Sequence, residues 1–204
     1  MKIIESIHGQ YVSGRRICTL ARHLGELIPP NASVLDVGCG DGALAALIGD
    51  SRPDLQLRGI DVLVRRDTAI PIEPFDGSHI PAGDRSVDIV MFADVLHHTD
   101  DPMTLLREAR RVTRRHILIK DHLRDGLLAE ATLRVMDGVG NARFGVSLPY
   151  HYWLRSQWDN AFGELGLRIE AWKPRLGIYP PWANWLFGRS LHFVARLGTG
   201  NHLP

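Results

Sequence analysis

The chain has 204 residues, of which 45% are hydrophobic and 23% are charged, so we expect one globular domain with a substantial core. Its 24 basic and 23 acidic residues leave a formal net charge of +1. That balance provides no general attraction for phosphate backbones, so the composition argues against a nucleic-acid partner.

Cysteine content and hydropathy indicate the compartment. Cys18 and Cys39 are too few for a disulfide framework or for a zinc site of their own. No apolar run approaches the ~20 residues that span a bilayer, and the first ten residues lack a signal-peptide core. We therefore expect a cytoplasmic domain without a transmembrane segment.

Helical and strand patterns alternate over the first 122 residues. A helical pattern at 17–28 ends at Pro29 and Pro30. Strong helix formers at 43–48 predict a second helix that ends at Gly49, and Asp101 with Pro102 predicts the start of a third. The expected strands between these helices are 34–37, 55–61, 70–75, 87–95 and 116–120.

The last third adds one helix and two strands. Ser156 and Asp159 resemble a capping box for a helix that ends at Gly166, and 167–172 and 191–196 are typical of strands. Alternating strands and helices predict an open, mostly parallel α/β sheet. Within a single domain over 1–204, we expect an N-terminal helical cap at 1–30, a cofactor-binding half at 31–122 and an acceptor-side half at 123–204.

A glycine loop follows the first expected strand. Gly38, Gly40 and Gly42 lie between that strand and a helix, where parallel sheets bind ligands beyond the carboxyl ends of their strands. The spacing Gly38-x-Gly40-x-x-Ala43 also fits a dinucleotide pattern, with Asp61 about 20 residues further on. An NAD(P)-dependent oxidoreductase is therefore one interpretation of this loop.

The carboxylate of Asp36 favours a different ligand. It stands two residues before the first glycine, where it suits a cationic ligand better than a pyrophosphate. S-adenosylmethionine carries an ammonium and a sulfonium. The sequence resembles the class I S-adenosylmethionine-dependent methyltransferases, particularly the type 11 methyltransferase-domain group, over roughly residues 30–122. The segments that carry this resemblance are Val34-Leu35-Asp36-Val37-Gly38-Cys39-Gly40-Asp41-Gly42, Gly59-Ile60-Asp61-Val62, Phe75-Asp76-Gly77, Ala93-Asp94-Val95-Leu96-His97-His98 and Asp101-Pro102.

The resemblance implies a Rossmann-like, doubly wound sheet of seven strands, mostly parallel with the last antiparallel. It also implies S-adenosylmethionine as methyl donor and S-adenosylhomocysteine as product. Asp36 would lie toward the methionine ammonium, which the Ala93 carbonyl would also face. Gly38, Cys39 and Gly40 would lie against the methionine part.

The same resemblance places the nucleoside. Asp61 would accept hydrogen bonds from both ribose hydroxyls, and Val62 would cover the adenine. Asp76 would bind the adenine amine, with the Gly77 amide nearby, although Asp76 and Gly77 could also form a plain turn. Related enzymes often fold an N-terminal segment over the cofactor, which makes two side chains candidates for its carboxylate: Tyr11 and Arg15.

Histidines supply candidate bases for an acceptor that must lose a proton. His97 follows the fourth expected strand and His122 the fifth, so both fall on the ligand-binding edge. We expect His122 to be the base rather than His97, because its ordinary pKa suits proton removal near neutrality. Asp121 would assist, although adjacent residues of a strand point apart and should not pair directly. His97 could instead only shape its loop.

The sequence narrows the acceptor but does not name it. Amino-group methyltransferases carry an Asp/Asn-Pro-Pro-aromatic motif after the fourth strand, where this chain has Ala93-Asp94-Val95-Leu96. We therefore expect a small-molecule acceptor, methylated on oxygen, and no metal. A non-catalytic cofactor-binding protein is a further alternative. Aromatic residues after the fifth strand favour an apolar or aromatic acceptor: Tyr150, Trp153, Trp182 and Trp185.

Overall fold

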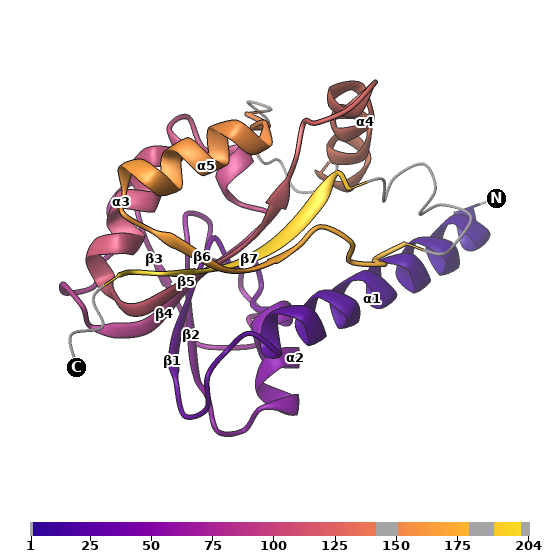
Figure 1. Cartoon of the computed structure of the whole chain (residues 1–204). Coiled ribbons are helices and arrows are strands. Elements are labelled where there is room, and N and C mark those ends of the chain that lie inside the picture. Colours follow the sequence, from indigo (N-terminus) through magenta and orange to yellow (C-terminus); the bar gives the residue numbers. More distant parts are fainter. Residues whose placement is uncertain (1, 142–150, 180–189, 201–204) are drawn as a thin grey trace.

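The computed structural model describes residues 2–141, 151–179 and 190–200, and the side chains of 14–136, 151–179 and 190–200. Its strands form one sheet (Figure 1) in the order β3-β2-β1-β4-β5-β7-β6. The strands are β1 Ser33–Val37, β2 Gln56–Asp61, β3 Ile72–Pro74, β4 Val87–Ala93, β5 Thr113–His122, β6 Arg168–Lys173 and β7 His192–Gly198.

Strand direction agrees with the expected doubly wound sheet. The pairs from β3 through β5 are all parallel. β7 runs antiparallel to both of its neighbours, β5 and β6. The last strand in the chain is thus inserted between its two neighbours, and the prediction of a mostly parallel sheet with an antiparallel last strand is confirmed.

Helices cover both faces of the sheet (Figure 1), with α1 and α2 on one side and α3 and α5 on the other. Among the described residues, no helix is long and apolar enough to cross a membrane. The helices are α1 Lys2–Gly25, α2 Ala43–Ser51, the short 3-10 helix η1 Leu96–His98, α3 Pro102–Val112, α4 Ala129–Asn141 and α5 Arg155–Glu164.

Strand residues alternate between two apolar cores. On β4, Ile89 and Met91 pack toward α1 and α2, while Val90 and Phe92 pack toward α3 and α5. This is the burial of both faces that a parallel sheet requires, and it explains the nearly continuous apolar run in the sequence.

Helix ends differ from the sequence predictions at several places. α1 runs from Lys2 to Gly25 rather than over 17–28, and α2 continues through Gly49 to Ser51. α5 begins at Arg155, where the Gln157 side chain accepts a hydrogen bond from the Leu154 amide. The predicted capping box was therefore wrong, because Asp159 pairs instead with Arg155, at 2.9 Å. For α3 the predicted cap is confirmed, since the Asp101 side chain accepts from the Met103 amide.

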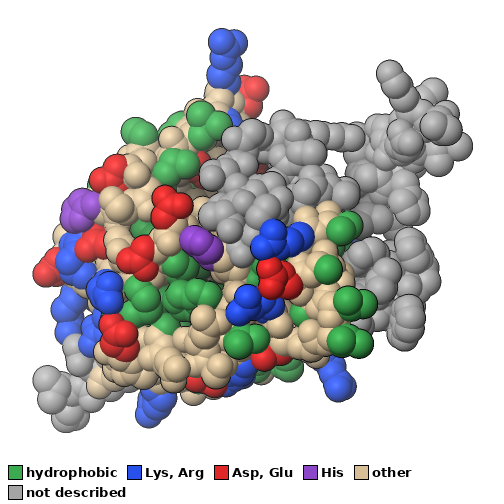
Figure 2. All heavy atoms as spheres, turned by 90° about the horizontal axis from the view of Figure 1, so that it is seen from above, with side chains coloured by type: hydrophobic (Ala, Val, Ile, Leu, Met, Phe, Trp, Pro, Cys, Tyr) green, Lys and Arg blue, Asp and Glu red, His purple; other side chains and the backbone are tan. Residues whose placement is uncertain are grey.

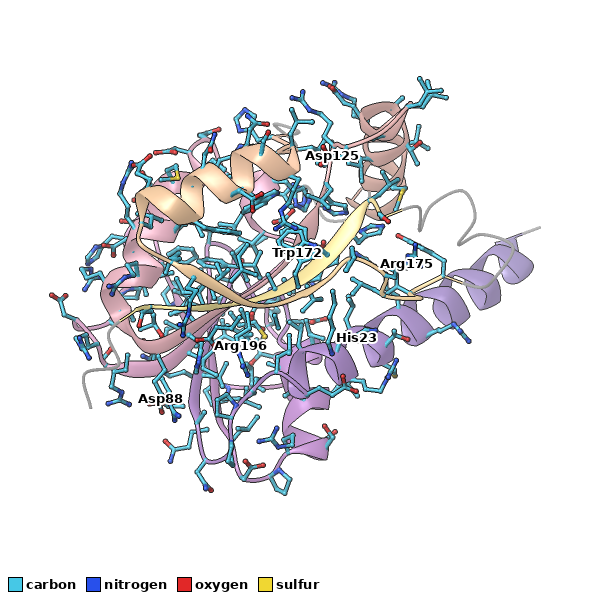
Figure 3. All side chains as sticks on the ribbon, viewed as in Figure 1. His23, Asp88, Asp125, Trp172, Arg175 and Arg196 are labelled. Carbon is cyan, nitrogen blue, oxygen red and sulfur yellow. The ribbon has the colours of Figure 1, made fainter. Side chains whose placement is uncertain are left out.

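Polar side-chain contacts join neighbouring elements away from the carboxyl edge of the sheet. At the amino edge of β4, Asp88 (Figure 3) accepts hydrogen bonds from the amide and hydroxyl of Ser33, at 2.9 and 2.8 Å. His23 of α1, labelled in the same view, contacts the Leu176 carbonyl at 2.9 Å. These contacts join β1 to β4 and α1 to the segment after β6. The carboxyl edge holds the loops that the sequence singled out.

The face seen in Figure 2 has acidic and basic side chains interspersed over its described part. It shows no continuous basic stripe there, as the near-zero net charge leads one to expect.

Candidate active site

The glycine loop joins the carboxyl end of β1 to α2. Gly38 and Gly40 have φ of +71° and +64°, a region that residues with a Cβ rarely adopt. A Cβ at Gly38 would lie 2.7 Å from Cγ2 of Val95, in the loop after β4. The absence of a side chain at Gly38 therefore allows the loop to pack close to the end of β4.

Asp36 is a buried carboxyl group beside this loop. It is 1% exposed, and its Oδ1 accepts no hydrogen bond from any described residue. Burial, with the nearby charge of Asp61, raises the pKa of Asp36 to about 8. Such a group is stabilised by a bound cation.

Asp61 links the end of β2 to the glycine loop. Its Oδ2 accepts a hydrogen bond from the Gly40 amide at 2.7 Å, and its Oδ1 accepts one from the Leu63 amide at 2.8 Å. The carboxylate therefore positions the loop and still has lone pairs for a diol ligand, because a carboxylate has about four acceptor sites.

The residues assigned to adenine gather beyond β2 and β3. Val62 is 64% exposed although it is apolar, and a Cβ on Gly77 would lie 3.2 Å from Cγ1 of Val62. Asp76 forms the turn that the sequence left open, since its Oδ1 accepts from the Ser78 and His79 amides, both at 2.7 Å. Those bonds lower the pKa of Asp76, so it is an ionised acceptor.

Cys39 lies within the glycine loop. A Cβ on Gly59 would lie 2.4 Å from Sγ of Cys39, so the thiol packs on β2. Burial and the charges of Asp36 and Asp61 raise the pKa of Cys39 to about 12, which leaves it protonated.

The N-terminal residues lie on α1. The side chain of Tyr11 is outside the described residues, and Arg15 is exposed. The neighbouring Arg16 is the one that reaches the strand edge, donating from Nη2 to Oδ2 of Asp94 at 2.6 Å. The sequence does not show which face of α1 meets the sheet, so it cannot tell which of the two adjacent arginines reaches the strand edge.

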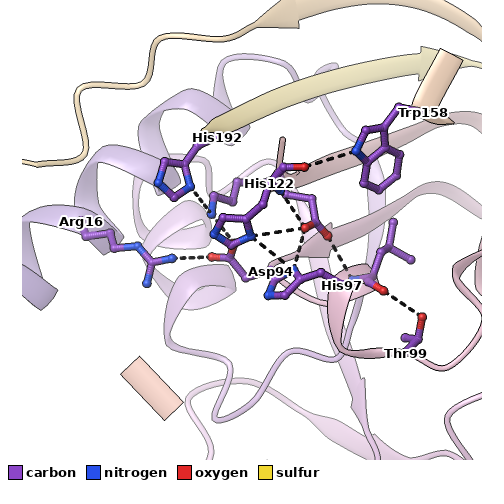
Figure 4. Close-up of polar contacts among 10 residues, drawn as sticks. Arg16, Asp94, His97, Thr99, His122, Trp158 and His192 are labelled. Atoms are coloured by element: carbon purple, nitrogen blue, oxygen red, sulfur yellow. Dashed lines mark hydrogen bonds and ion pairs between the residues drawn. The ribbon is translucent and has the colours of Figure 1, made fainter. Parts of the chain in front are cut away.

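A second cluster lies at the ends of β4 and β5 (Figure 4). Asp121 is fully buried, and its Oδ1 accepts from Nδ1 of His97 at 2.6 Å and from the His122 amide at 2.7 Å. Its Oδ2 accepts from the Leu96 amide at 3.1 Å. Burial alone would raise the pKa of Asp121, but the imidazoles of His97 and His122 hold it below its usual range.

His122 completes this cluster. Its Nδ1 lies 3.3 Å from Nδ1 of His97 and 3.4 Å from Oδ1 of Asp121. The expectation that Asp121 and His122 do not pair directly was wrong. β5 ends at His122, and at this end the His122 amide donates a hydrogen bond to Oδ1 of Asp121. Burial, the charge of Lys120 and the neighbouring His97 lower the pKa of His122 well below its usual value.

Two residues that the sequence analysis did not select, Lys120 and His192, also belong to the cluster. Lys120 is fully buried, and its Nζ donates to Oδ1 of Asp94, whose Oδ2 faces Arg16. His192 of β7 lies 3.5 Å from Nζ of Lys120 (Figure 4). Lys120 itself is the signal in the sequence that could have identified this cluster, because a charged residue within a buried apolar strand needs a partner.

Asp94, His97 and His122 could share a cation, because one ligand atom from each lies within 4.8 Å of the others. In this structure the cations beside Asp94 are the side chains of Lys120 and Arg16. The expectation of a site without metal stays a prediction.

An aromatic ring that packs beside the cluster is not one of the four named from the sequence. Tyr152 stacks on His97 with ring centroids 5.6 Å apart, whereas Trp153, one of the four, packs against Trp158 at 4.8 Å in the core under α5. The other predicted aromatic residues lie outside the described residues: Tyr150, Trp182 and Trp185.

These features fit S-adenosylmethionine. The buried Asp36 needs a cation, the glycine loop admits close approach of a ligand, and Asp61 presents a carboxylate at the end of β2. Together with the 3-2-1-4-5-7-6 sheet, they define a class I S-adenosylmethionine-dependent methyltransferase. A family model described as a methyltransferase domain matches residues 8–171, and the chain belongs to this family.

Curated proteins are similar to part of this chain. Ribosomal RNA-processing protein 8 of Caenorhabditis elegans is 36% identical over 84 residues, which are 41% of this chain and 22% of that protein. The 27-O-demethylrifamycin SV methyltransferase of Amycolatopsis mediterranei (strain S699) is 28% identical over 110 residues, 47% and 40% of the two chains. The chain thus spans less than half the length of these curated relatives.

A solved structure supports the fold. A methyltransferase in complex with the Haloferax volcanii Trm112 activator superposes with a TM-score of 0.67 at 15% identity, covering 88% of each chain.

Proposed function

We propose that this methyltransferase acts on a hydroxyl group of a small-molecule acceptor. The observation that carries the proposal is the buried cluster of Asp121, His97 and His122 at the same sheet edge as the glycine loop. An oxygen acceptor must lose a proton when it is methylated, and an imidazole paired with a carboxylate is suited to take it. The name of the rifamycin relative shows that an O-methyltransferase exists among similar proteins.

The proposed cofactor contacts lie at the carboxyl ends of β1, β2, β3 and β4. Asp36 would face the ammonium, with Gly38, Cys39, Gly40 and the Ala93 carbonyl around the methionine part. When bound, S-adenosylmethionine supplies an electrophilic methyl group. The residues that would hold its nucleoside are Asp61, Val62, Asp76 and Gly77, and Tyr11 and Arg15 remain proposals for its carboxylate.

The acceptor is proposed to be an apolar or aromatic small molecule in the cytoplasm. Tyr152 and the imidazoles of His97 and His122 form an aromatic surround for the cluster, with ring centroids 5.6 and 5.8 Å from that tyrosine. Such rings favour an acceptor with an aromatic or apolar body. A nucleic-acid acceptor is not part of the proposal.

Labelled-methyl transfer tests the proposal. The purified protein is incubated with methyl-labelled S-adenosylmethionine and a small-molecule extract of the source organism, and labelled products are identified by mass spectrometry. We expect label on an oxygen of a low-molecular-weight product. Label on nitrogen or carbon, or label only in an RNA fraction added in parallel, would contradict the proposed acceptor.

Calorimetry separates the alternatives. The proposed function requires S-adenosylmethionine to bind and NAD not to bind. Binding of NAD alone would support the oxidoreductase. Tight binding of S-adenosylmethionine with no label transferred to any extract would support a non-catalytic cofactor-binding protein.

A further inference from the structure

Asp121 organises two elements that meet at the acceptor side of the site. It is the penultimate residue of β5, and its two oxygens accept from the Leu96 amide and from Nδ1 of His97, both in η1. Asp121 and His97 are 0% and 1% exposed. A buried carboxylate with several donors has a fixed position, so His97 is fixed with it.

This contact determines which nitrogen of His97 carries a proton. An ionised carboxylate can only accept hydrogen bonds, so the 2.6 Å contact requires a proton on Nδ1 of His97. In a neutral imidazole the lone pair then lies on Nε2. A carboxylate on Nδ1 also stabilises the imidazolium that forms when Nε2 takes a proton.

His122 contacts the same carboxylate at a longer distance, its Nδ1 lying 3.4 Å from Oδ1 of Asp121, and its other neighbours differ. Its Nδ1 is 3.7 Å from Oδ1 of Asp94, the oxygen that already receives Nζ of Lys120, and it faces the proton-bearing Nδ1 of His97 at 3.3 Å. A second positive charge there would face Lys120, with His192 on the other side at a ring-centroid distance of 4.7 Å. The lowered pKa of His122 agrees with a neutral ring, which is a weak base.

We propose that His97 is the proton acceptor of the reaction, that Asp121 is its positioning residue, and that His122 stays neutral beside them. The inference rests on the proposed methylation of a hydroxyl. As the acceptor oxygen bonds to the methyl carbon, its proton passes to Nε2 of His97. The carbon–sulfur bond breaks with its electron pair remaining on sulfur, and His97 afterwards returns the proton to solvent.

The titratable and charged groups around His97 come from several elements. They are Asp121, Lys120 and His122 on β5, Asp94 at the end of β4, His98 on η1 with its ring 4.0 Å away, and Tyr152. Of these, Asp121 alone has a carboxylate oxygen at 2.6 Å from the ring.

Nitrogen-15 NMR of the full chain tests the pairing without any acceptor. We expect His97 to carry its proton on Nδ1, with a strongly downfield proton resonance, and Asp121→Asn to abolish that resonance. Asp121→Glu should restore it in part. A proton on Nε2 of His97, or an unchanged spectrum in Asp121→Asn, would overturn the assignment whether or not the protein methylates an acceptor.

Turnover then separates the two histidines. The rate of methyl transfer is measured with methyl-labelled S-adenosylmethionine and the extract as acceptor source. His97→Asn and Asp121→Asn should each lower this rate roughly 10²–10⁴-fold, the size expected for loss of a general base. Both variants should keep the cofactor affinity of the unmodified protein, as measured by calorimetry. Asp121→Asn should also change the acidic limb of the pH–rate profile. His122→Asn should lose less than about tenfold.

A buried histidine at the other end of β5 supplies the control. His116 lies 3.2 Å from Glu170, so His116→Asn removes a similar pair away from the site and should leave turnover and the His97 resonance unchanged. A larger loss of rate in His122→Asn than in His97→Asn would overturn the inference and make His122 the base. Absence of any label transfer, with Nδ1 of His97 protonated and cofactor bound, would refute the proposed function and the base role and leave only the pairing.

Discussion

Asp36 illustrates how a single residue can be costly for the fold and suited to a ligand. A carboxyl group with 1% exposure, and with an oxygen that accepts no hydrogen bond from any described residue, is destabilised when it ionises. Its pKa of about 8 lies above the ordinary value of 3.8, so the folded chain binds a proton more tightly than the unfolded chain. Compared with a carboxyl group of ordinary pKa, Asp36 therefore makes its full contribution to the free energy of unfolding below about pH 4. That contribution is lost as the pH rises toward 8.

Asp36→Asn should therefore stabilise the apo protein at high pH while weakening cofactor binding. We expect the gain in free energy of unfolding to be near zero at pH 4 and on the order of 5 kcal/mol at pH 8, because the difference between a pKa of 3.8 and one of about 8 corresponds to about 1.4 kcal/mol per pH unit. Denaturation at both pH values measures it, and calorimetry should show weaker S-adenosylmethionine binding. An equal gain at both pH values would show that Asp36 does not titrate in this range.

Asp61→Ala should weaken S-adenosylmethionine binding by about 1.5–3 kcal/mol, because two charge-assisted hydrogen bonds to the ribose are lost. Titration calorimetry gives the value, and thermal melting shows whether release of the Gly40 amide also loosens the fold. Asp54→Ala is the matched control, since Asp54 pairs with Arg52 away from the loop. An unchanged affinity in Asp61→Ala would remove Asp61 from the ribose site.

Among the elements, the glycine loop depends most on its backbone. Gly38 and Gly40 share a left-handed conformation, yet their surroundings differ. The Cβ of an alanine would meet Val95 at 2.7 Å at the first position, but only Nη2 of Arg65, at 3.8 Å, at the second. Packing therefore restricts Gly38, whereas the space beside Gly40 is available to a ligand.

Paired alanine substitutions separate these two effects. Gly38→Ala should lower the free energy of unfolding by about 2–4 kcal/mol, from the left-handed φ and the clash with Val95. Gly40→Ala should cost only about 1–2 kcal/mol in stability and still impair cofactor binding. Urea denaturation and calorimetry measure the two quantities. Normal cofactor affinity in a folded Gly40→Ala protein would show that the loop is not the cofactor site.

At the scale of the whole molecule, the cluster at the ends of β4 and β5 joins distant parts of the chain. Arg16 reaches Asp94 across 78 residues, and Lys120 reaches the same carboxylate across 26. Burial raises and these two cations lower the pKa of Asp94, with a net fall, so the carboxylate stays charged. One ionised side chain thus connects α1, the end of β4 and the end of β5.

The link between α1 and the sheet predicts different roles for two adjacent arginines. Arg16→Ala should weaken S-adenosylmethionine binding roughly 5–20-fold, because it releases α1 from the strand edge beside the cofactor site. Arg15→Ala should also weaken binding, through loss of the proposed contact with the cofactor carboxylate, but should leave the melting temperature unchanged because Arg15 is exposed. Calorimetry and thermal melting of both variants decide this. Unchanged affinity in Arg15→Ala would remove Arg15 from the cofactor site.

The sequence by itself determined the class of fold and the cofactor edge. The alternation of apolar runs with capped helices is local, and the motif from Asp36 through the glycine loop places its chemistry within a few consecutive residues. These patterns can be recognised from consecutive residues, without any knowledge of long-range contacts. The helix ends at Ser51 and Arg155 were missed because packing overrides weak local capping preferences.

Only the tertiary structure decided how the acceptor side is arranged. The contacts of His97 with Asp121, and of Asp94 with Arg16 and Lys120, join elements that are far apart in the chain, and no local spacing encodes them. Which face of α1 meets the sheet, and how β5 turns at His122, depend on the packing of both cores. The physical reason is that hydrophobic periodicity specifies which face is buried but not which buried polar groups meet.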